Sequence, residues 1–102
     1  MKAVQAGNIS FMAETAKHVI FKGRVQGVGF RWTVHRIVLG YDLTGFVKNL
    51  PDGTVEMLAQ GDVKEIQSCL NDIADSFGGY IRDTQISQAE PDGTYTQFRI
   101  TF

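Results

Sequence analysis

The sequence is poor in the features that cross-link a chain, span a membrane or attract polyanions. It has one cysteine, Cys69, so an internal disulfide is excluded and a reducing compartment is favoured. No apolar run approaches the roughly 20 residues that a membrane-spanning helix needs. The formal net charge of -1 gives the chain no overall basic character for binding nucleic acid or anionic lipid. We therefore expect a cytoplasmic protein with no nucleic-acid or membrane partner.

Histidine is also scarce, which bears on metal binding. His18 and His35 stand apart from each other and from Cys69, and the three residues show no metal-ligand spacing. Cys69 belongs to an apolar stripe with helical spacing, which favours a buried, inert thiol over a nucleophile. We therefore expect no metal site.

The 102 residues and the hydrophobic content of 43% indicate one packed domain. Residues 1–17 contain few apolar residues and lack the pattern of a signal peptide. We expect them to form a flexible N-terminal extension, followed by a single domain over residues 18–102. We also expect that domain to be a monomer.

Hydrophobic periodicity and turn residues predict the order of the elements. A short β-branched and aromatic run predicts a strand, and apolar residues three and four positions apart predict two helices. Pro-Asp-Gly turns at 51–53 and 91–93 separate the remaining strands. The predicted elements are a strand at 18–22, a helix from 30 to 41, a hairpin of 43–50 with 54–60, a helix capped by Asp62 with an apolar stripe from 66 to 77, and strands at 81–89 and 95–102. This β-α-β-β-α-β order, in which the turn at 91–93 splits the last strand, predicts an α+β fold, a ferredoxin-like split βαβ sandwich with two helices on one face of a four- to five-stranded, mostly antiparallel sheet.

A glycine-rich segment joins the first predicted strand to the first helix. Residues 23–31 read Gly-Arg-Val-Gln-Gly-Val-Gly-Phe-Arg, with three glycines in seven residues. Such a loop can point successive backbone N–H groups inward, and the helix that follows adds its own free N–H groups and the positive end of its dipole. The loop is thus a candidate phosphate site. Its spacing matches neither the Rossmann nor the Walker pattern, so nucleotide binding is not implied.

Arg31 strengthens the interpretation of the loop as an anion site. A cation in the first helical turn faces the positive end of the dipole, which is unfavourable unless an anion lies between them. Arginine suits that task because its planar fork holds two phosphate oxygens at once. The charge of residues 18–61 is +2, against −4 for residues 62–102, so the first half favours an anion. A plain connecting loop followed by a surface arginine is the alternative.

Two long motifs resemble the acylphosphatase family. Residues 23–31 resemble its first motif, and residues 43–56, which read Leu-Thr-Gly-Phe-Val-Lys-Asn-Leu-Pro-Asp-Gly-Thr-Val-Glu, resemble its second. The twelve residues between Arg31 and Thr44 match the usual family separation. One departure is visible, because the common Leu-Gly-Leu that ends the first helix is replaced by Tyr41-Asp42-Leu43.

The resemblance implies an activity and the residues that carry it. Members hydrolyse acyl phosphates to a carboxylate and inorganic phosphate, without metal, cofactor or covalent intermediate. Arg31 occupies the position of the arginine that binds the substrate phosphate, and Asn49 that of the asparagine that positions the attacking water. The positions whose backbone N–H groups bind phosphate are occupied by Gln26, Gly27, Val28, Gly29 and Phe30. The expected partner is a small acyl phosphate whose acyl group the sequence does not specify.

This chemistry needs no strong base. An acyl phosphate is already activated, so catalysis needs mainly positioning and neutralisation of the phosphoryl oxygens. A phosphate oxygen can then accept the proton of the water. Two alternatives stay open at this point. Asn49, just before a Pro-Asp-Gly turn, is typical of turn chemistry, and His35, one helical turn after Arg31, is either a solvated helix residue or a base.

Two other functions compete with the hydrolase. One is a non-catalytic phosphate- or anion-binding regulatory module, since acylphosphatase-like domains also occur fused to larger enzymes such as carbamoyltransferases of hydrogenase maturation. The 102 residues leave no room for such a partner domain, so we expect a stand-alone enzyme. The other is an RNA-binding domain of the same architecture, with Phe21, Phe46 and Phe98 as its stacking platform. The acidic second half argues against RNA.

Overall fold

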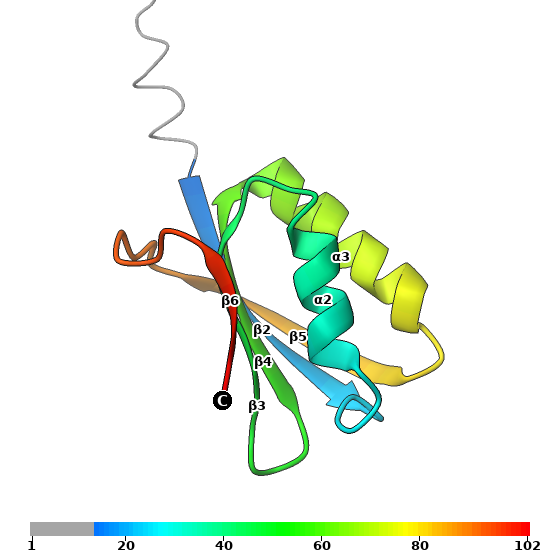
Figure 1. Cartoon of the computed structure of the whole chain (residues 1–102). Helices are drawn as coiled ribbons and strands as arrows, with labels where there is room; N and C mark the ends of the chain where they lie inside the picture. Colours follow the sequence, from blue (N-terminus) through cyan, green and yellow to red (C-terminus); the bar gives the residue numbers. More distant parts are fainter. Residues whose placement is uncertain (1–13) are drawn as a thin grey trace, which may run out of the picture.

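The computed structural model describes residues 14–102, and these form a two-layer α/β sandwich (Figure 1). The expected α+β, ferredoxin-like class is confirmed. The elements in chain order are β2 (Glu14–Gly23), α2 (Phe30–Val38), β3 (Thr44–Asn49), β4 (Val55–Asp62), α3 (Val63–Phe77), β5 (Ile81–Ala89) and β6 (Phe98–Thr101).

One five-stranded sheet has the order β5-β2-β4-β3-β6. Its neighbours are antiparallel, except that β6 runs parallel to β3. The two final strands therefore lie on opposite edges of the sheet. The expectation that they form one strand split by a turn is wrong in this respect, because the connection between them crosses the end of the sheet. Gln60 of β4 holds that connection, accepting from Asp92 N at 2.7 Å and donating to Asp92 O at 3.0 Å.

Both helices cover the same face of the sheet, as Figure 1 shows. The predicted apolar stripe of the first helix is buried at Phe30, Val34 and Val38. That of the second is buried at Ile66, Cys69, Leu70 and Ile73. Alternate residues of the central strands, among them Val19, Val47 and Met57, meet these stripes and are fully buried. No helix within residues 14–102 is long and apolar enough to cross a bilayer.

The first strand begins at Glu14, four residues before the predicted start at His18. Residues 14–17 pair with β4 from Glu14↔Asp62 to Lys17↔Ala59, and Ala16 is fully buried. They therefore belong to the sheet, and the expected extension over 1–17 is wrong for these four residues. Their polar composition hides the strand, whose backbone is satisfied by partners distant in sequence. The rest of the expected extension lies outside the described residues.

Two glycines allow close backbone approaches in the sheet, Gly23 at the end of β2 next to the glycine-rich loop and Gly45 near the start of β3, at the opposite end of the sheet. Gly23 has φ 133°, and a Cβ there would lie 2.2 Å from the carbonyl oxygen of Tyr80. Arg24 N then donates to the same oxygen at 2.8 Å. Gly45 has φ 133° as well, and its Cβ would lie 1.9 Å from the carbonyl oxygen of Leu58. Only glycine fits at either position. The contact of Gly23 and Arg24 with the carbonyl oxygen of Tyr80 fixes the end of β2 before the chain turns into the loop.

Candidate functional site

The loop between β2 and α2 has the conformation that its glycines predict. Gly27 has φ 75° and Gly29 has φ 77°. A Cβ at either residue would meet nothing within 4 Å, so the backbone angle, and not crowding, requires glycine there. Backbone in which left-handed residues alternate with right-handed ones forms concavities lined by N–H groups, which bind anions.

The start of α2 adds uncompensated positive potential. Its N-cap residue Gly29 makes no side-chain cap, and the first turn contains no acidic residue. The first intrahelical hydrogen bond runs from Thr33 N to Gly29 O at 3.1 Å. The N–H groups of Phe30, Arg31 and Trp32 therefore have no acceptor inside the helix. An anion at this end would be favoured by those N–H groups and by the helix dipole.

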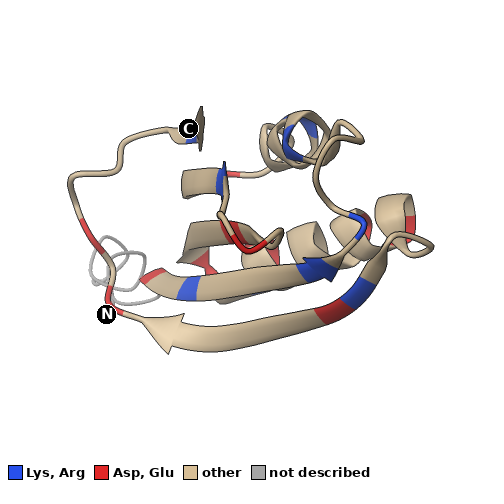
Figure 2. Cartoon of the chain, turned by 90° about the horizontal axis from the view of Figure 1, so that it is seen from below, with Lys and Arg blue, Asp and Glu red and all other residues tan. Residues whose placement is uncertain are grey.

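A cavity of about 170 Å³ lies between the loop, the start of α2 and the end of β3. Its lining consists of Val25, Gly27, Gly29, Phe30, Arg31, Trp32 and Asn49. The structure thus brings Arg31 and Asn49 together with three of the five predicted loop residues. Val28 instead packs against the hydrophobic core, and Gln26 lies outside the lining. Figure 2, which views this end of the molecule, shows lysine and arginine at the end of β2, in the loop and in α2.

Arg31 is held from the side of β6. Its Nη1 donates to Thr101 O at 3.5 Å, and its Cζ lies 4.8 Å from the ring centroid of Phe102. Within residues 14–102 the contact between a basic and an acidic side chain is that of His18 Nε2 with Glu56 Oε2 at 2.8 Å, on the open face of the sheet, and no carboxylate pairs with Arg31. Its charge is therefore available to an anion in the cavity.

Asn49 ends β3 and presents an unusual atom. Its Oδ1 is buried and has no hydrogen-bond partner within the described part of the chain. A buried amide oxygen without a donor costs about 1–3 kcal/mol, so such an atom needs an explanation. An oxygen that lines a cavity can accept a hydrogen bond from a small molecule that enters it. Turn chemistry alone does not account for this orientation.

The side chain of Gln26 links the two predicted motifs. Its Nε2 donates to Leu50 O and to Thr54 O, both at 2.8 Å. These two carbonyls flank the turn that follows Asn49, so Gln26 fixes the glycine loop against the end of the hairpin. Sequence reasoning assigned Gln26 a backbone role alone, and no local pattern indicates this contact, since its partners are 24 and 28 residues away.

The other candidate groups are engaged elsewhere. Asp52 Oδ1 accepts from Thr54 Oγ1 at 2.6 Å and from Thr54 N at 3.0 Å, which lowers the pKa of Asp52 and makes it a turn residue. The ring of His35 lies 6.3 Å from that of Phe98 and does not line the cavity. Cys69 is buried in the core, and desolvation raises the pKa of its thiol to about 12. Among residues 14–102 no group of histidine, cysteine and acidic side chains is arranged to hold a metal ion.

Two residues of the lining were not predicted. Val25 is 1% exposed and belongs to the core, so its place in the lining follows from packing. Trp32 is 62% exposed and comes directly after Arg31 in the first turn of α2. A tryptophan directly after a motif arginine was the signal in the sequence that could have drawn attention to it.

Known proteins share both the sequence and the fold. The sequence model of the acylphosphatase family matches residues 17–100. An acylphosphatase of Geobacillus thermodenitrificans is 45% identical over 86 residues, which cover 83% of this chain and 92% of that protein. The crystal structure of acylphosphatase from Bacillus subtilis has a TM-score of 0.78 at 30% identity, covering 86% of this chain and 99% of that one. Full-length HypF in its phosphate- and nucleotide-bound form has a TM-score of 0.79 at 30% identity, covering 87% of this chain and 12% of that one.

Proposed function

The chain belongs to the acylphosphatase family, and from that premise we propose which of its residues carry the hydrolysis of an acyl phosphate. Acylphosphatase activity cleaves a carboxyl-phosphate anhydride to a carboxylate and inorganic phosphate. Arg31 and the N–H groups of Gln26 to Phe30 bind the phosphoryl group, and Asn49 positions the attacking water.

Phosphate binding is the role of the loop and of Arg31. A phosphoryl group in the cavity meets the free N–H groups at the start of α2 and an arginine without a carboxylate partner among residues 14–102. The planar guanidinium donates two hydrogen bonds to two phosphoryl oxygens. Charge that spreads over these oxygens in the transition state is thereby neutralised, and this is the main requirement of phosphoryl transfer.

Water positioning is the role of Asn49. Its unpartnered Oδ1 accepts a hydrogen bond from a water, which orients the oxygen lone pair of that water toward phosphorus. The P–O bond to the carboxylate breaks as the new P–O bond forms. The lining contains no carboxylate or histidine from the described residues, so we assign the proton of the water to a phosphoryl oxygen.

One observation carries this proposal. Arg31, on α2, and Asn49, on β3, line the same cavity together with the glycine loop. A surface arginine alone would have an ordinary structural explanation, whereas the convergence of Arg31 with the unpartnered amide oxygen of Asn49 on one concavity does not.

Phosphate release from benzoyl phosphate tests the assignment. We expect turnover that persists in a chelator and that inorganic phosphate inhibits competitively. Arg31→Ala and Asn49→Ala should each lower kcat/KM at least about 100-fold, the scale of losing one transition-state donor, with an unchanged circular dichroism spectrum. Arg36→Ala, an exposed arginine of the same helix, is the matched control. A fully active Arg31→Ala protein contradicts these roles, and loss of turnover in the chelator points to a metal enzyme.

A regulatory module remains the second candidate, and the likeness to 12% of full-length HypF favours it. A module that binds phosphate without catalysis would show competitive binding of inorganic phosphate in calorimetry and no release from benzoyl phosphate. Turnover by the wild-type chain rejects this candidate.

We further propose a cytoplasmic monomer that does not bind RNA. Phe21 and Phe98 are 2% and 5% exposed and lie in the core, so two of the three rings of the supposed stacking platform are not accessible. Cys69 is a buried free thiol, which suits a reducing compartment. Sedimentation equilibrium and a filter-binding assay with single-stranded RNA check the oligomeric state and the RNA binding.

A further inference from the structure

The cavity is too small to enclose a whole acyl phosphate that has a bulky acyl group. Its volume is about 170 Å³, whereas pockets that enclose small molecules typically measure about 300–1,000 Å³. The phosphoryl group belongs at the free N–H groups of the loop and at Arg31, in the interior. The acyl chain must therefore lie at the mouth of the cavity, against whatever side chain is exposed there.

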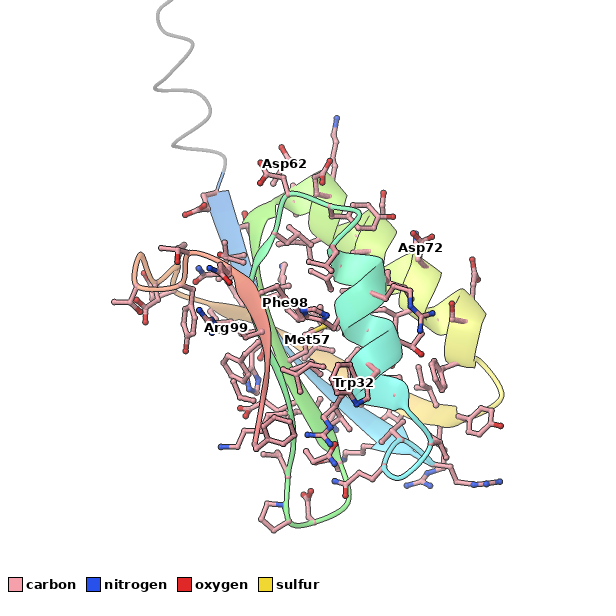
Figure 3. The ribbon with its side chains drawn as sticks, viewed as in Figure 1. Trp32, Met57, Asp62, Asp72, Phe98 and Arg99 are labelled. Carbon is pink, nitrogen blue, oxygen red and sulfur yellow. The ribbon has the colours of Figure 1, made fainter. Side chains whose placement is uncertain are left out.

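Trp32 is the exposed apolar side chain of the lining. Val25 and Phe30 are each 1% exposed, and the ring of Phe30 packs edge-to-face on Phe21 and Phe77 in the core. Neither the ring of Phe30 nor the methyl groups of Val25 are free to cover a ligand. Trp32 is 62% exposed, and Figure 3 shows it on the first turn of α2. An acyl chain that leaves the cavity therefore has one large apolar surface of the lining to contact.

The indole of Trp32 is not a second cation for the phosphoryl group. It is neutral, so it does not neutralise phosphoryl oxygens as Arg31 does. An aromatic ring stacked on another aromatic group adds about 0.5–1.5 kcal/mol beyond its area burial, which corresponds to about two- to twelvefold in binding. A small acyl group such as acetyl offers little area for this contact.

We propose that Trp32 is a specificity-determining residue, which binds the acyl group of the substrate and selects aromatic or extended apolar acyl phosphates over acetyl phosphate. This inference rests on the proposed function, because it takes the phosphoryl group to occupy the loop. It names the class of acyl group that the two motifs leave open.

Kinetics with two substrates test the proposal. We expect Trp32→Ala to lower kcat/KM for benzoyl phosphate about three- to tenfold and to leave kcat/KM for acetyl phosphate within about twofold. Trp32→Phe should retain most of the preference. The inhibition constant of inorganic phosphate should not change, since the phosphate site is intact. Leu39→Ala is the control, because it removes an apolar side chain of similar exposure, 65%, that lies outside the cavity lining. It should leave kcat/KM unchanged for both substrates.

If Trp32→Ala lowers kcat/KM equally for both substrates, or changes it for neither, the proposal is overturned while the hydrolase assignment stays in place. A wild-type chain that hydrolyses neither substrate counts against the proposed function instead, and binding then decides the role of Trp32. Trp32 is the sole tryptophan of the sequence, so its fluorescence reports on this position alone. Benzylphosphonate should change the emission at saturation, and methylphosphonate should change it much less. Equal responses to the two phosphonates reject the contact.

Discussion

The guanidinium of Arg31 lies over the ring of Phe102, with 4.8 Å from Cζ to the ring centroid. The same side chain donates to Thr101 O at 3.5 Å. The last residue of β6 and the phenylalanine that follows it thus orient an arginine that is 70 residues before Thr101 in the chain. β6 pairs with β3, and β3 carries Asn49. The edge strand β6 therefore supports both proposed catalytic residues.

Removing the ring of Phe102 should impair catalysis more than stability. A cation–π contact at an exposed site contributes about 0.5–1 kcal/mol, so we expect Phe102→Ala to lower kcat/KM about two- to fivefold. Phe102→Tyr should keep the wild-type value. The melting temperature should hardly change, since Phe102 is 85% exposed. Unaltered kcat/KM in Phe102→Ala would show that Arg31 is oriented without the ring.

Removing the amide of Gln26 should separate the loop from the hairpin. Gln26→Ala loses two hydrogen bonds of 2.8 Å, which together contribute about 1–3 kcal/mol to the free energy of unfolding. The hairpin keeps its backbone bond from Leu50 N to Thr54 O at 2.9 Å, so we expect the variant to fold. Urea unfolding measures the loss of stability. Benzoyl phosphate kinetics measure what the separation of the loop from the hairpin does to turnover. Gln67→Ala, which loses one exposed bond to Asn71, is the control and should affect neither.

Replacing two different glycines by alanine should have very different effects on stability. At Gly45 an added Cβ would lie 1.9 Å from the carbonyl oxygen of Leu58, and its φ of 133° is unfavourable for alanine. We expect Gly45→Ala to lose more than about 3 kcal/mol in guanidinium unfolding, or to fail to fold. At Gly93 an added Cβ meets nothing within 4 Å, so Gly93→Ala should change the free energy of unfolding by less than about 1 kcal/mol. Similar losses in the two variants would be incompatible with this packing.

Cys69 should be inert in the folded protein. Desolvation in the core raises the pKa of its thiol from 9.0 to about 12, so the thiolate is scarce at neutral pH. We expect iodoacetamide to leave Cys69 unmodified in buffer and to modify it in urea, as measured by mass spectrometry. Because the folded pKa is the higher one, the contribution of this group to stability is complete below pH 9 and declines as the pH rises toward 12. Cys69→Ala should remove the part of the loss of stability at high pH that this thiol causes.

Truncation should separate the contribution of the first strand residues from that of the site. A chain that starts at His18 loses the pairing of Glu14 to Lys17 with β4 and the buried Ala16. We expect a chain of residues 18–102 to melt at a lower temperature than a chain of residues 14–102. Both should retain turnover at low temperature, because the cavity lies beyond the other end of β2. Equal melting temperatures would show that these pairings contribute nothing to stability.

The sequence was informative wherever the cause of a structure is local. The helices were predictable because their apolar residues recur every three or four positions, and their buried stripes are the predicted ones. The glycine loop was predictable because Gly27 and Gly29 permit the positive φ that the structure shows. The start of β2 was missed because Glu14 to Lys17 lack a local apolar pattern, and their strand depends on pairing with β4.

The arrangement of the site depends on contacts between residues far apart in the chain. Local periodicity contains no information on which edge β6 joins, on the carbonyls that Gln26 reaches, or on the ring that lies against Arg31. The exposure of Trp32 and the unpartnered Oδ1 of Asn49 likewise follow from how β3 and α2 pack together. Residue types and their spacing thus predict a phosphate-binding loop and the chemistry available to it. The convergence of that loop with Asn49 and with the mouth of the cavity arises only when the sheet assembles, because pairing distant strands is what brings these groups within reach of one small molecule.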